Sequence, residues 1–166
     1  MNTEHKSNTP AEIKDLWETP RSVFERLNDE FNFSTDVASS DENHLCPNWL
    51  TENDDALKLG QSWGRSNWCN PPYSSIKPWV DAAILHHKQG STTVMLVPSD
   101  TSVQWFKAAY ESCNEIRFIS GRLAFINAET QKPVKGNNKG SVLFIWRAHC
   151  KSHCVSLIGR DELMRE

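Results

Sequence analysis

The chain has 166 residues, 38% of them hydrophobic, with a formal net charge of −3 and a mean hydropathy of −0.58. This is the length and composition of one folded domain, and no segment approaches the roughly 18 apolar residues that span a membrane. The weak negative charge excludes tight binding of nucleic acid by charge alone, so any such contact must come from a local basic patch.

The N-terminal residues 1–15 are polar and contain no apolar segment of the kind found in secretory signals. We therefore expect a flexible segment at 1–15, a single domain at 16–166 and a cytoplasmic location. The cysteines lack a repeated CxxC spacing, which favours reduced thiols. Neither His149-Cys150 nor His153-Cys154 has the spacing of a standard zinc motif, so no metal is predicted.

The first predicted elements are a helix and a short strand. Thr19 is a good N-cap and Pro20 suits the first helical position, so with the apolar spacing that follows they predict a helix ending near Phe31. Residues 31–38 then read as a strand with Asp36 near its end. An acidic residue followed by small residues is typical of sites for nucleotide-like cofactors. Because glycine is absent here, a phosphate cradle is excluded, which disfavours NAD and ATP.

The central motif is Asn70-Pro71-Pro72-Tyr73, which follows a predicted buried strand at 66–69. Two successive prolines forbid a continued strand or an immediate helix, so the backbone is held in a fixed, extended loop. The Asn70 side-chain oxygen and the Pro71 carbonyl are converging acceptors, and the Tyr73 ring offers a flat face beside them. This arrangement suits a planar amino group; the alternative is a rigid surface turn.

The remaining elements alternate between helices and strands. We expect helices at 76–89 and 101–112, and strands at 92–97, 115–119 and 141–147. The strand at 92–97 is apolar almost throughout, as in strands buried on both faces of a parallel sheet. Together these elements predict an α/β domain with a parallel-rich sheet.

Two polar segments have both a functional and a structural interpretation. The long loop at 127–140 carries Lys132, Lys135 and Lys139, which suit contacts with phosphates; the alternative is a solvated hairpin tip. Asp55 lies in an Asn- and Asp-rich segment. It is either an acceptor for an adenine amino group or part of an exposed turn.

Six blocks of the sequence form an ordered set. They are Trp17-Glu18-Thr19-Pro20, Asp36-Val37-Ala38, Asp55-Ala56-Leu57 with Trp63, Asn70-Pro71-Pro72-Tyr73, Leu96-Val97-Pro98 with Trp105-Phe106, and Gly121-Arg122-Leu123-Ala124-Phe125. In this set the chain resembles the phage-type DNA adenine-N6 methyltransferases, the Dam family of phages and prophages. It departs from the wider methyltransferase pattern at Asp36-Val37-Ala38-Ser39-Ser40, where a glycine-containing first motif is usual.

The resemblance implies a Rossmann-like class I methyltransferase fold in a single domain. It also implies S-adenosylmethionine as the cofactor, double-stranded DNA as the substrate and the cytoplasm of a bacterial host as the location. The oligomeric state stays open between a monomer and a homodimer. Because one small domain leaves no room for a large target-recognition module, we expect a short or relaxed target sequence that loops such as 127–140 read.

The resemblance also implies a role for individual residues. Asn70 and the Pro71 carbonyl would accept hydrogen bonds from the amino group of a flipped adenine, and Tyr73 would stack on that base. The catalytic set is Asn70, Pro71, Pro72 and Tyr73. The cofactor-binding set is Trp17, Thr19, Pro20, Asp36, Ala38, Asp55 and Ala56. The substrate-binding set is Tyr73, Lys132, Lys135, Lys139, Phe125 as a second wall of the base pocket, and Arg122 as a phosphate contact or a core-edge ion pair.

Two other functions remain open. Asn-Pro-Pro-Tyr also occurs in glutamine methyltransferases that modify release factors, so the substrate could be a protein glutamine or an RNA. The missing glycines also allow a catalytically decayed protein that only binds DNA. Cofactor binding separates this last possibility from the enzymes, and the identity of the methylated molecule separates the enzymes from each other.

Overall fold

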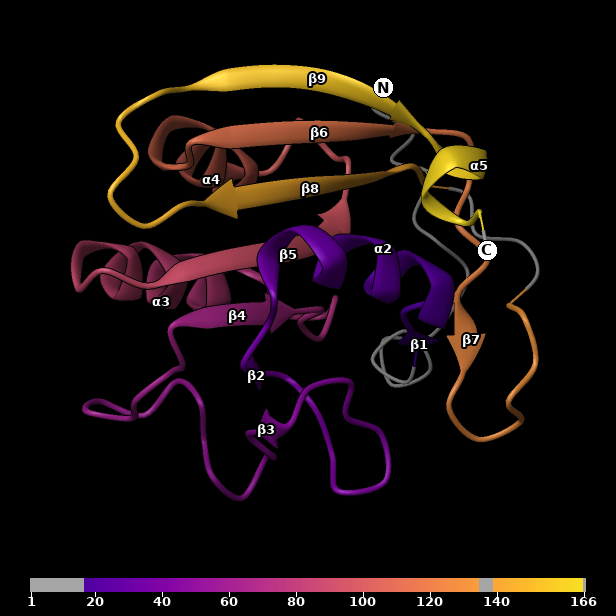
Figure 1. Ribbon diagram of the computed structural model, residues 1–166, viewed down its shortest axis with the longest axis horizontal. Helices are drawn as coiled ribbons and strands as arrows, with labels where there is room; N and C mark the ends of the chain where they lie inside the picture. The colour runs from indigo at the N-terminus through magenta and orange to yellow at the C-terminus, as the bar shows by residue number, and fades with distance from the viewer. Residues whose placement is uncertain (1–16, 135–138, 166) are drawn as a thin grey trace, which may run out of the picture.

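The computed structural model describes residues 17–134 and 139–165 (Figure 1). The segment at 1–15 and Lys135 lie outside these residues. The described strands form a seven-stranded sheet in the order β3-β2-β4-β5-β8-β6-β9 and a separate ladder of β1 and β7. The strand bounds are β1 Trp17–Glu18, β2 Thr35–Asp36, β3 Asn48–Trp49, β4 Ser66–Cys69, β5 Thr92–Pro98, β6 Glu115–Ser120, β7 Ile126–Asn127, β8 Ser141–Trp146 and β9 Cys154–Gly159.

All strands of the main sheet run in one direction except β8, which is antiparallel to both of its neighbours, β5 and β6. The sheet is therefore mostly parallel, as predicted. The carboxyl ends of β2, β4 and β5 meet at one edge, where the strands end at Asp36, Cys69 and Pro98. In open α/β sheets this is the edge where ligands bind.

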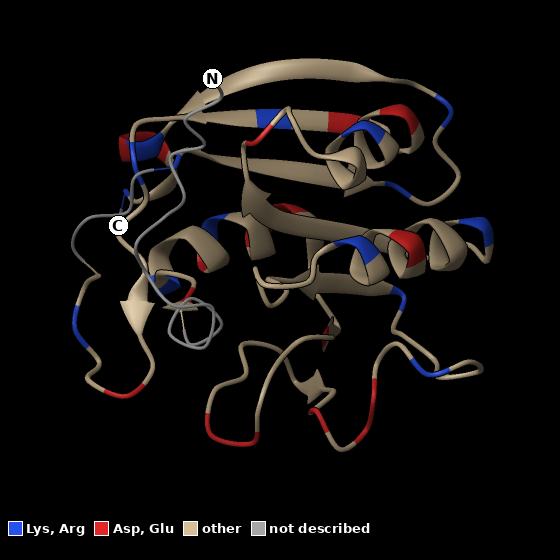
Figure 2. Ribbon diagram, turned by 180° about the vertical axis from the view of Figure 1, so that it is seen from behind, with Lys and Arg blue, Asp and Glu red and all other residues tan. Residues whose placement is uncertain are grey.

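Helices cover both faces of the sheet (Figures 1 and 2). Helices α2 (Arg21–Phe31) and α5 (Arg160–Leu163) contribute to one core cluster, and α3 (Lys77–Lys88) and α4 (Gln104–Ser112) contribute to the other. The side chains of β8 alternate between the two clusters, so this strand joins both halves of the core. None of the described helices is long and apolar enough to cross a membrane.

The predicted helices and the strands β4, β5, β6 and β8 are confirmed. Two details were wrong. The strand expected at 31–38 is only Thr35–Asp36, because α2 continues to Phe31 and Asn32 leaves it in the left-handed region at φ 47°. Thr19 does not cap α2, because the N-cap is Pro20 and no side chain bonds to the helix start.

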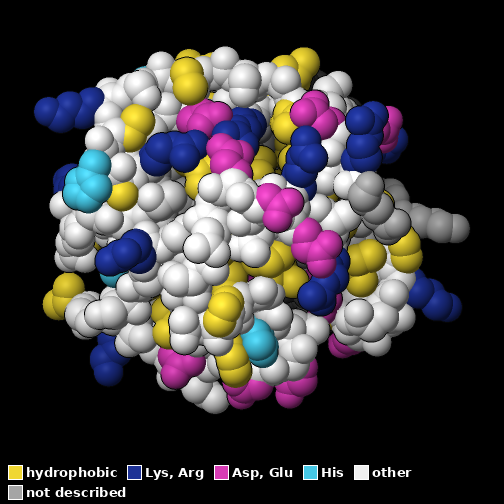
Figure 3. All heavy atoms as spheres, in the orientation of Figure 1, with side chains coloured by type: hydrophobic (Ala, Val, Ile, Leu, Met, Phe, Trp, Pro, Cys, Tyr) yellow, Lys and Arg dark blue, Asp and Glu magenta, His cyan; other side chains and the backbone are white. Residues whose placement is uncertain are grey.

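A charge network ties α2 to the sheet. Arg117 donates to Glu30 at 2.7 and 2.8 Å and to Glu115 at 2.6 Å, and Arg147 donates to the same two carboxylates at 3.3 and 3.2 Å. Both guanidinium groups also lie over the Phe31 ring. Figure 3 shows side chains of both signs gathered over the beginning of β6 on this face. The network fixes the C-terminal end of α2 against β6 and β8.

Candidate active site

Asn70 lies immediately beyond β4, which is a central strand between β2 and β5. Two prolines follow it, so the strand ends there, and α3 begins only at Lys77. The Asn70 Nδ2 donates a hydrogen bond to the backbone carbonyl of Trp17 at 3.3 Å. Its Oδ1 is buried and has no partner within the described residues. Asn70 therefore presents a free acceptor at the carboxyl edge of the sheet.

Three buried polar side-chain atoms lack a hydrogen-bond partner within the described residues: Asn70 Oδ1, Trp17 Nε1 and Thr19 Oγ1. Trp17 and Thr19 belong to the segment around β1, which the Trp17–Asn70 hydrogen bond brings to the end of β4. Leaving such a group buried and unpaired costs roughly 1–3 kcal/mol. Because all three atoms belong to this one region, we interpret it as a binding site for a ligand with polar groups.

An aromatic cluster lies beside these atoms. The Trp17 ring stacks on Phe125 with centroids 5.7 Å apart, and the Tyr73 ring meets Phe125 edge-on at 6.1 Å. The Tyr73 hydroxyl donates to the Leu96 carbonyl at 3.4 Å, which anchors the ring at the end of β5. Burial raises the pKa of the Tyr73 hydroxyl above its usual value, so the group stays protonated and is no candidate for a general base.

Asp36, the last residue of β2, is 4% exposed. Its carboxylate accepts backbone N–H bonds from Leu45 at 3.1 Å and Ala38 at 3.4 Å. Burial nevertheless raises the pKa of this carboxyl group to about 6, although these bonds and nearby His44 act to lower it. The folded protein therefore stabilises the Asp36 charge incompletely, and a ligand that donates hydrogen bonds or carries a positive charge would stabilise it further.

The loops between β2 and β4 contain the other two predicted cofactor residues. Asp55 is exposed at φ 52°, and its Oδ1 accepts the Leu57 N–H at 3.2 Å. Ala56 is buried, and its carbonyl accepts the indole N–H of Trp63 at 2.9 Å. Residues 39–57 contain no Lys or Arg, and Figure 2 shows the acidic segments along these loops. The acidic segment at 39–57 is therefore unsuited to binding phosphate groups.

Apart from Tyr73, which follows β4, the predicted substrate residues lie on the segments that follow β6. Arg122 is exposed and forms no ion pair with any described residue, which disfavours the core-edge ion pair. Lys132 is exposed, whereas Lys139 pairs with Asp100 at 3.3 Å. Lys135 lies outside the described residues. The structure thus brings Trp17, Tyr73 and Phe125 together, and leaves the basic residues at the surface around them.

Sequence reasoning missed four hydrogen-bond partners of Asn70, Tyr73 and Asp36. They are the carbonyls of Trp17 and Leu96 and the backbone N–H groups of Leu45 and Ala38. All four are main-chain groups: every residue has the carbonyl, and every residue other than proline has the N–H. No residue-specific signal in the sequence could have identified them.

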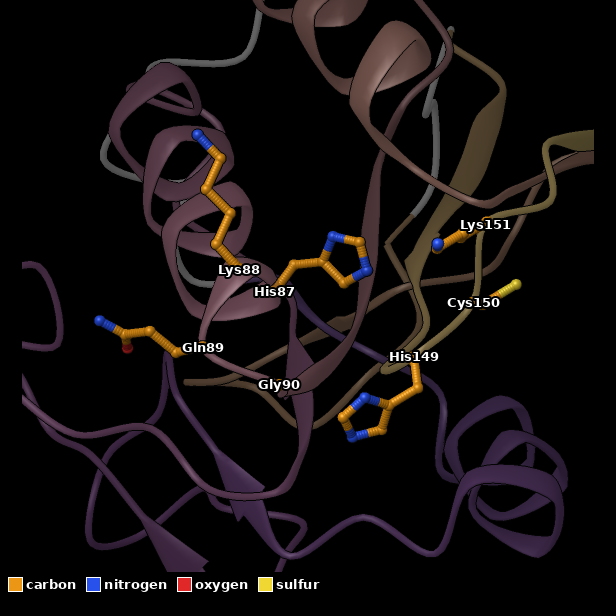
Figure 4. A pocket seen from close by; sticks show the side chains of 7 residues that line it. All are labelled: His87, Lys88, Gln89, Gly90, His149, Cys150 and Lys151. Carbon is orange, nitrogen blue, oxygen red and sulfur yellow. The ribbon is translucent and has the colours of Figure 1, made fainter.

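A hollow among the described residues lies at the opposite edge of the sheet from Asn70. It is lined by His87, Lys88, Gln89, Gly90, His149, Cys150 and Lys151 (Figure 4), which precede β5 or follow β8. The His87 Nε2 is already engaged with the Arg147 carbonyl at 3.0 Å. No group of three or more His, Cys, Asp or Glu side chains among the described residues could hold a metal ion. We therefore place the candidate site at the Asn70 edge.

Comparisons with known proteins identify the family. The family model described as DNA N-6-adenine-methyltransferase (Dam) matches residues 6–166. The chain is 39% identical over 159 residues to a DNA N-6-adenine-methyltransferase of Escherichia phage T1, covering 85% of this chain and 66% of that protein. It is 38% identical over 165 residues to a DNA N-6-adenine-methyltransferase of Haemophilus phage HP1 (strain HP1c1), covering 92% of each chain. This chain belongs to the DNA N-6-adenine-methyltransferase (Dam) family.

Proposed function

We propose that this chain transfers a methyl group from S-adenosylmethionine to N6 of an adenine flipped out of double-stranded DNA. Family membership supports adenine-N6 methylation of DNA as the reaction. The observation that carries the residue roles is the buried Asn70 Oδ1 at the carboxyl edge of the sheet, which has no hydrogen-bond partner among the described residues. A mostly parallel sheet with helices on both faces supports a Rossmann-like class I fold.

The residues around β1 and β2 fit S-adenosylmethionine. The cofactor has an amino group, a carboxylate, ribose hydroxyls and an adenine but no phosphate, which agrees with the absence of a glycine-rich cradle. Trp17 Nε1 and Thr19 Oγ1, which have no partner in the described part of the chain, are donors for its oxygens, and Asp36 is an acceptor for its amino group or ribose. Pro20, Ala38, Asp55 and Ala56 complete the proposed set. When bound, the cofactor supplies an electrophilic methyl group.

The Asn70 loop suits the adenine amino group. Asn70 Oδ1 and the Pro71 carbonyl accept its two N–H bonds, which raises the electron density on N6 and fixes its direction. Tyr73 stacks on the base, with its ring held by Leu96 and Phe125. Attack by N6 on the cofactor's methyl group would form the N6–C bond and break the methyl–sulfur bond, and N6 would lose one proton afterwards. No strong base is required because positioning supplies much of the acceleration.

The DNA backbone fits the segments that follow β6. Arg122 and Lys132 are exposed there, and Lys139 can exchange its Asp100 partner for a phosphate. The acidic segment at 39–57, which has no Lys or Arg, repels phosphate and so favours a DNA position on the β7 side (Figure 2). With few cationic contacts, the binding is expected to be weak, with a shallow dependence on salt, and the target sequence short.

Methyl transfer from labelled S-adenosylmethionine to unmethylated duplex DNA tests this proposal, with nucleoside analysis of the product. Label should appear in N6-methyladenine, and Asn70→Ala should lower the rate by roughly 10²–10³-fold while the cofactor still binds. Asn53→Ala, in an exposed turn, is the matched control and should retain activity. Cofactor binding without transfer to DNA would point to a protein or RNA substrate. Absence of cofactor binding would favour a decayed DNA-binding protein.

A further inference from the structure

The orientation of the Asn70 amide is set by the main chain of β1. Its Nδ2 donates to the Trp17 carbonyl at 3.3 Å, and the opposite end of the amide, Oδ1, is the buried atom without a partner within the described residues. The two ends of an amide differ in hydrogen bonding, because the nitrogen only donates and the oxygen only accepts. A carbonyl at the position of Trp17 therefore selects the rotamer that turns Oδ1 towards the site.

The Trp17 carbonyl points towards Asn70 because of how β7 is paired. On one side β7 forms a hairpin, in which Asn127 N–H donates to the Lys132 carbonyl at 2.9 Å. The N–H and C=O groups of successive residues in a strand point to opposite sides. The N–H and C=O groups of Ile126 therefore point away from the hairpin and towards β1, where Ile126 pairs with Glu18. Trp17 is one residue earlier in β1, so its N–H and C=O groups point away from β7, and its carbonyl faces Asn70 at the end of β4.

We propose that the β1–β7 ladder is a positioning device for methyl transfer, in which the main-chain carbonyl of Trp17 holds the Asn70 amide with Oδ1 towards the adenine amino group. This inference rests on the proposed function. Trp17 acts here as a positioning residue, through its backbone and apart from any contact of its indole ring. The ladder does this from a segment that lies 53 positions before Asn70 in the sequence.

The variant Asn70→Asp tests the hydrogen bond itself. It keeps the shape and one acceptor oxygen but replaces the donor by a second oxygen, so the ionised carboxylate of this variant repels the Trp17 carbonyl. We expect kcat to fall at least about tenfold near pH 8, with unchanged KM values for cofactor and DNA. Burial raises the pKa of a carboxyl at this edge of the sheet, as at Asp36, so activity relative to the unchanged protein should rise as the pH is lowered towards about 5.5, because a protonated carboxyl can again donate to Trp17. Equal activity near pH 8, or a ratio independent of pH, would overturn the inference.

A pair of proline variants tests the ladder. Ile126→Pro removes the N–H that faces β1, whereas Ala128→Pro places proline in the turn of the same hairpin, where it is tolerated. Ile126→Pro should lower kcat about tenfold while Ala128→Pro does not, with thermal unfolding as the check on folding. If Ile126→Pro fails to fold, the pH profile of Asn70→Asp decides. If the unchanged protein methylates DNA and both Asn70→Asp and Ile126→Pro do so at the same rate, only the positioning role is refuted. If the unchanged protein does not methylate DNA, the proposed function is refuted.

Discussion

Replacing Asp36 by Asn should stabilise the ligand-free protein above about pH 6. The pKa of Asp36 is about 6 in the fold against an ordinary 3.8, and each unit corresponds to about 1.4 kcal/mol, so burying the charge costs about 3 kcal/mol at neutral pH. The Asn side chain keeps one acceptor for the N–H groups of Leu45 and Ala38 but loses the other, at a cost of about 1 kcal/mol. The expected net gain is about 2 kcal/mol.

The sign of the pH dependence follows from which state holds the proton. Between the ordinary pKa and about pH 6 the folded protein keeps the Asp36 proton while the unfolded chain releases it, so Asp36 lowers the stability as the pH rises through this window. The amide side chain of the variant cannot titrate. The advantage of the variant should therefore be absent near pH 4 and complete above about pH 6.

Urea unfolding of both proteins without cofactor, in steps from about pH 4 to pH 8, measures this difference. Cofactor binding provides the second half of the test, because a ligand that stabilises the Asp36 charge should bind less tightly to Asp36→Asn. For the unchanged protein, affinity should fall as the pH drops through about 6. A stability difference that is the same at every pH would refute the assignment of the cost to the buried charge.

Four further substitutions separate binding, stability and DNA contact. Thr19→Val removes a buried hydroxyl without a partner in the described structure, so it should stabilise the free protein by about 1 kcal/mol in urea unfolding and weaken cofactor binding in titration calorimetry. Arg117→Ala leaves Glu30 and Glu115 with Arg147 as their remaining partner in the charge network and should lower the unfolding free energy by about 1 kcal/mol, with methyl transfer per folded molecule unchanged. Lys132→Ala should reduce the slope of log affinity for DNA against log salt by about 1, and Lys139→Ala by less, because Lys139 is already ion-paired; equal slopes for all three proteins would exclude a phosphate contact at Lys132.

The sequence by itself determined the elements whose signals are local. Helical and strand periodicity predicted α2, α3, α4, β5, β6 and β8, because burial of one stripe or of both faces leaves a regular apolar pattern. The two prolines after Asn70 likewise predicted the end of β4, since proline restricts its own backbone and that of the residue before it. The chemistry expected of the Asn-Pro-Pro-Tyr loop remains a prediction that the proposed experiments test.

Pairing between distant segments was decided only by the tertiary structure. The strands β1, β3 and β7 are two residues each, too short for any periodicity, and β9 was missed although it is longer, because it is an exposed edge strand without a buried face. Thr19 has the side chain of an N-cap, yet the chain enters α2 through Pro20, which leaves the Thr19 hydroxyl buried without a partner among the described residues. The partner of Asn70 is a main-chain carbonyl, which any residue at that position would supply. Its placement depends on the β1–β7 ladder because hydrogen bonds between distant strands form only when the whole fold brings their backbones together.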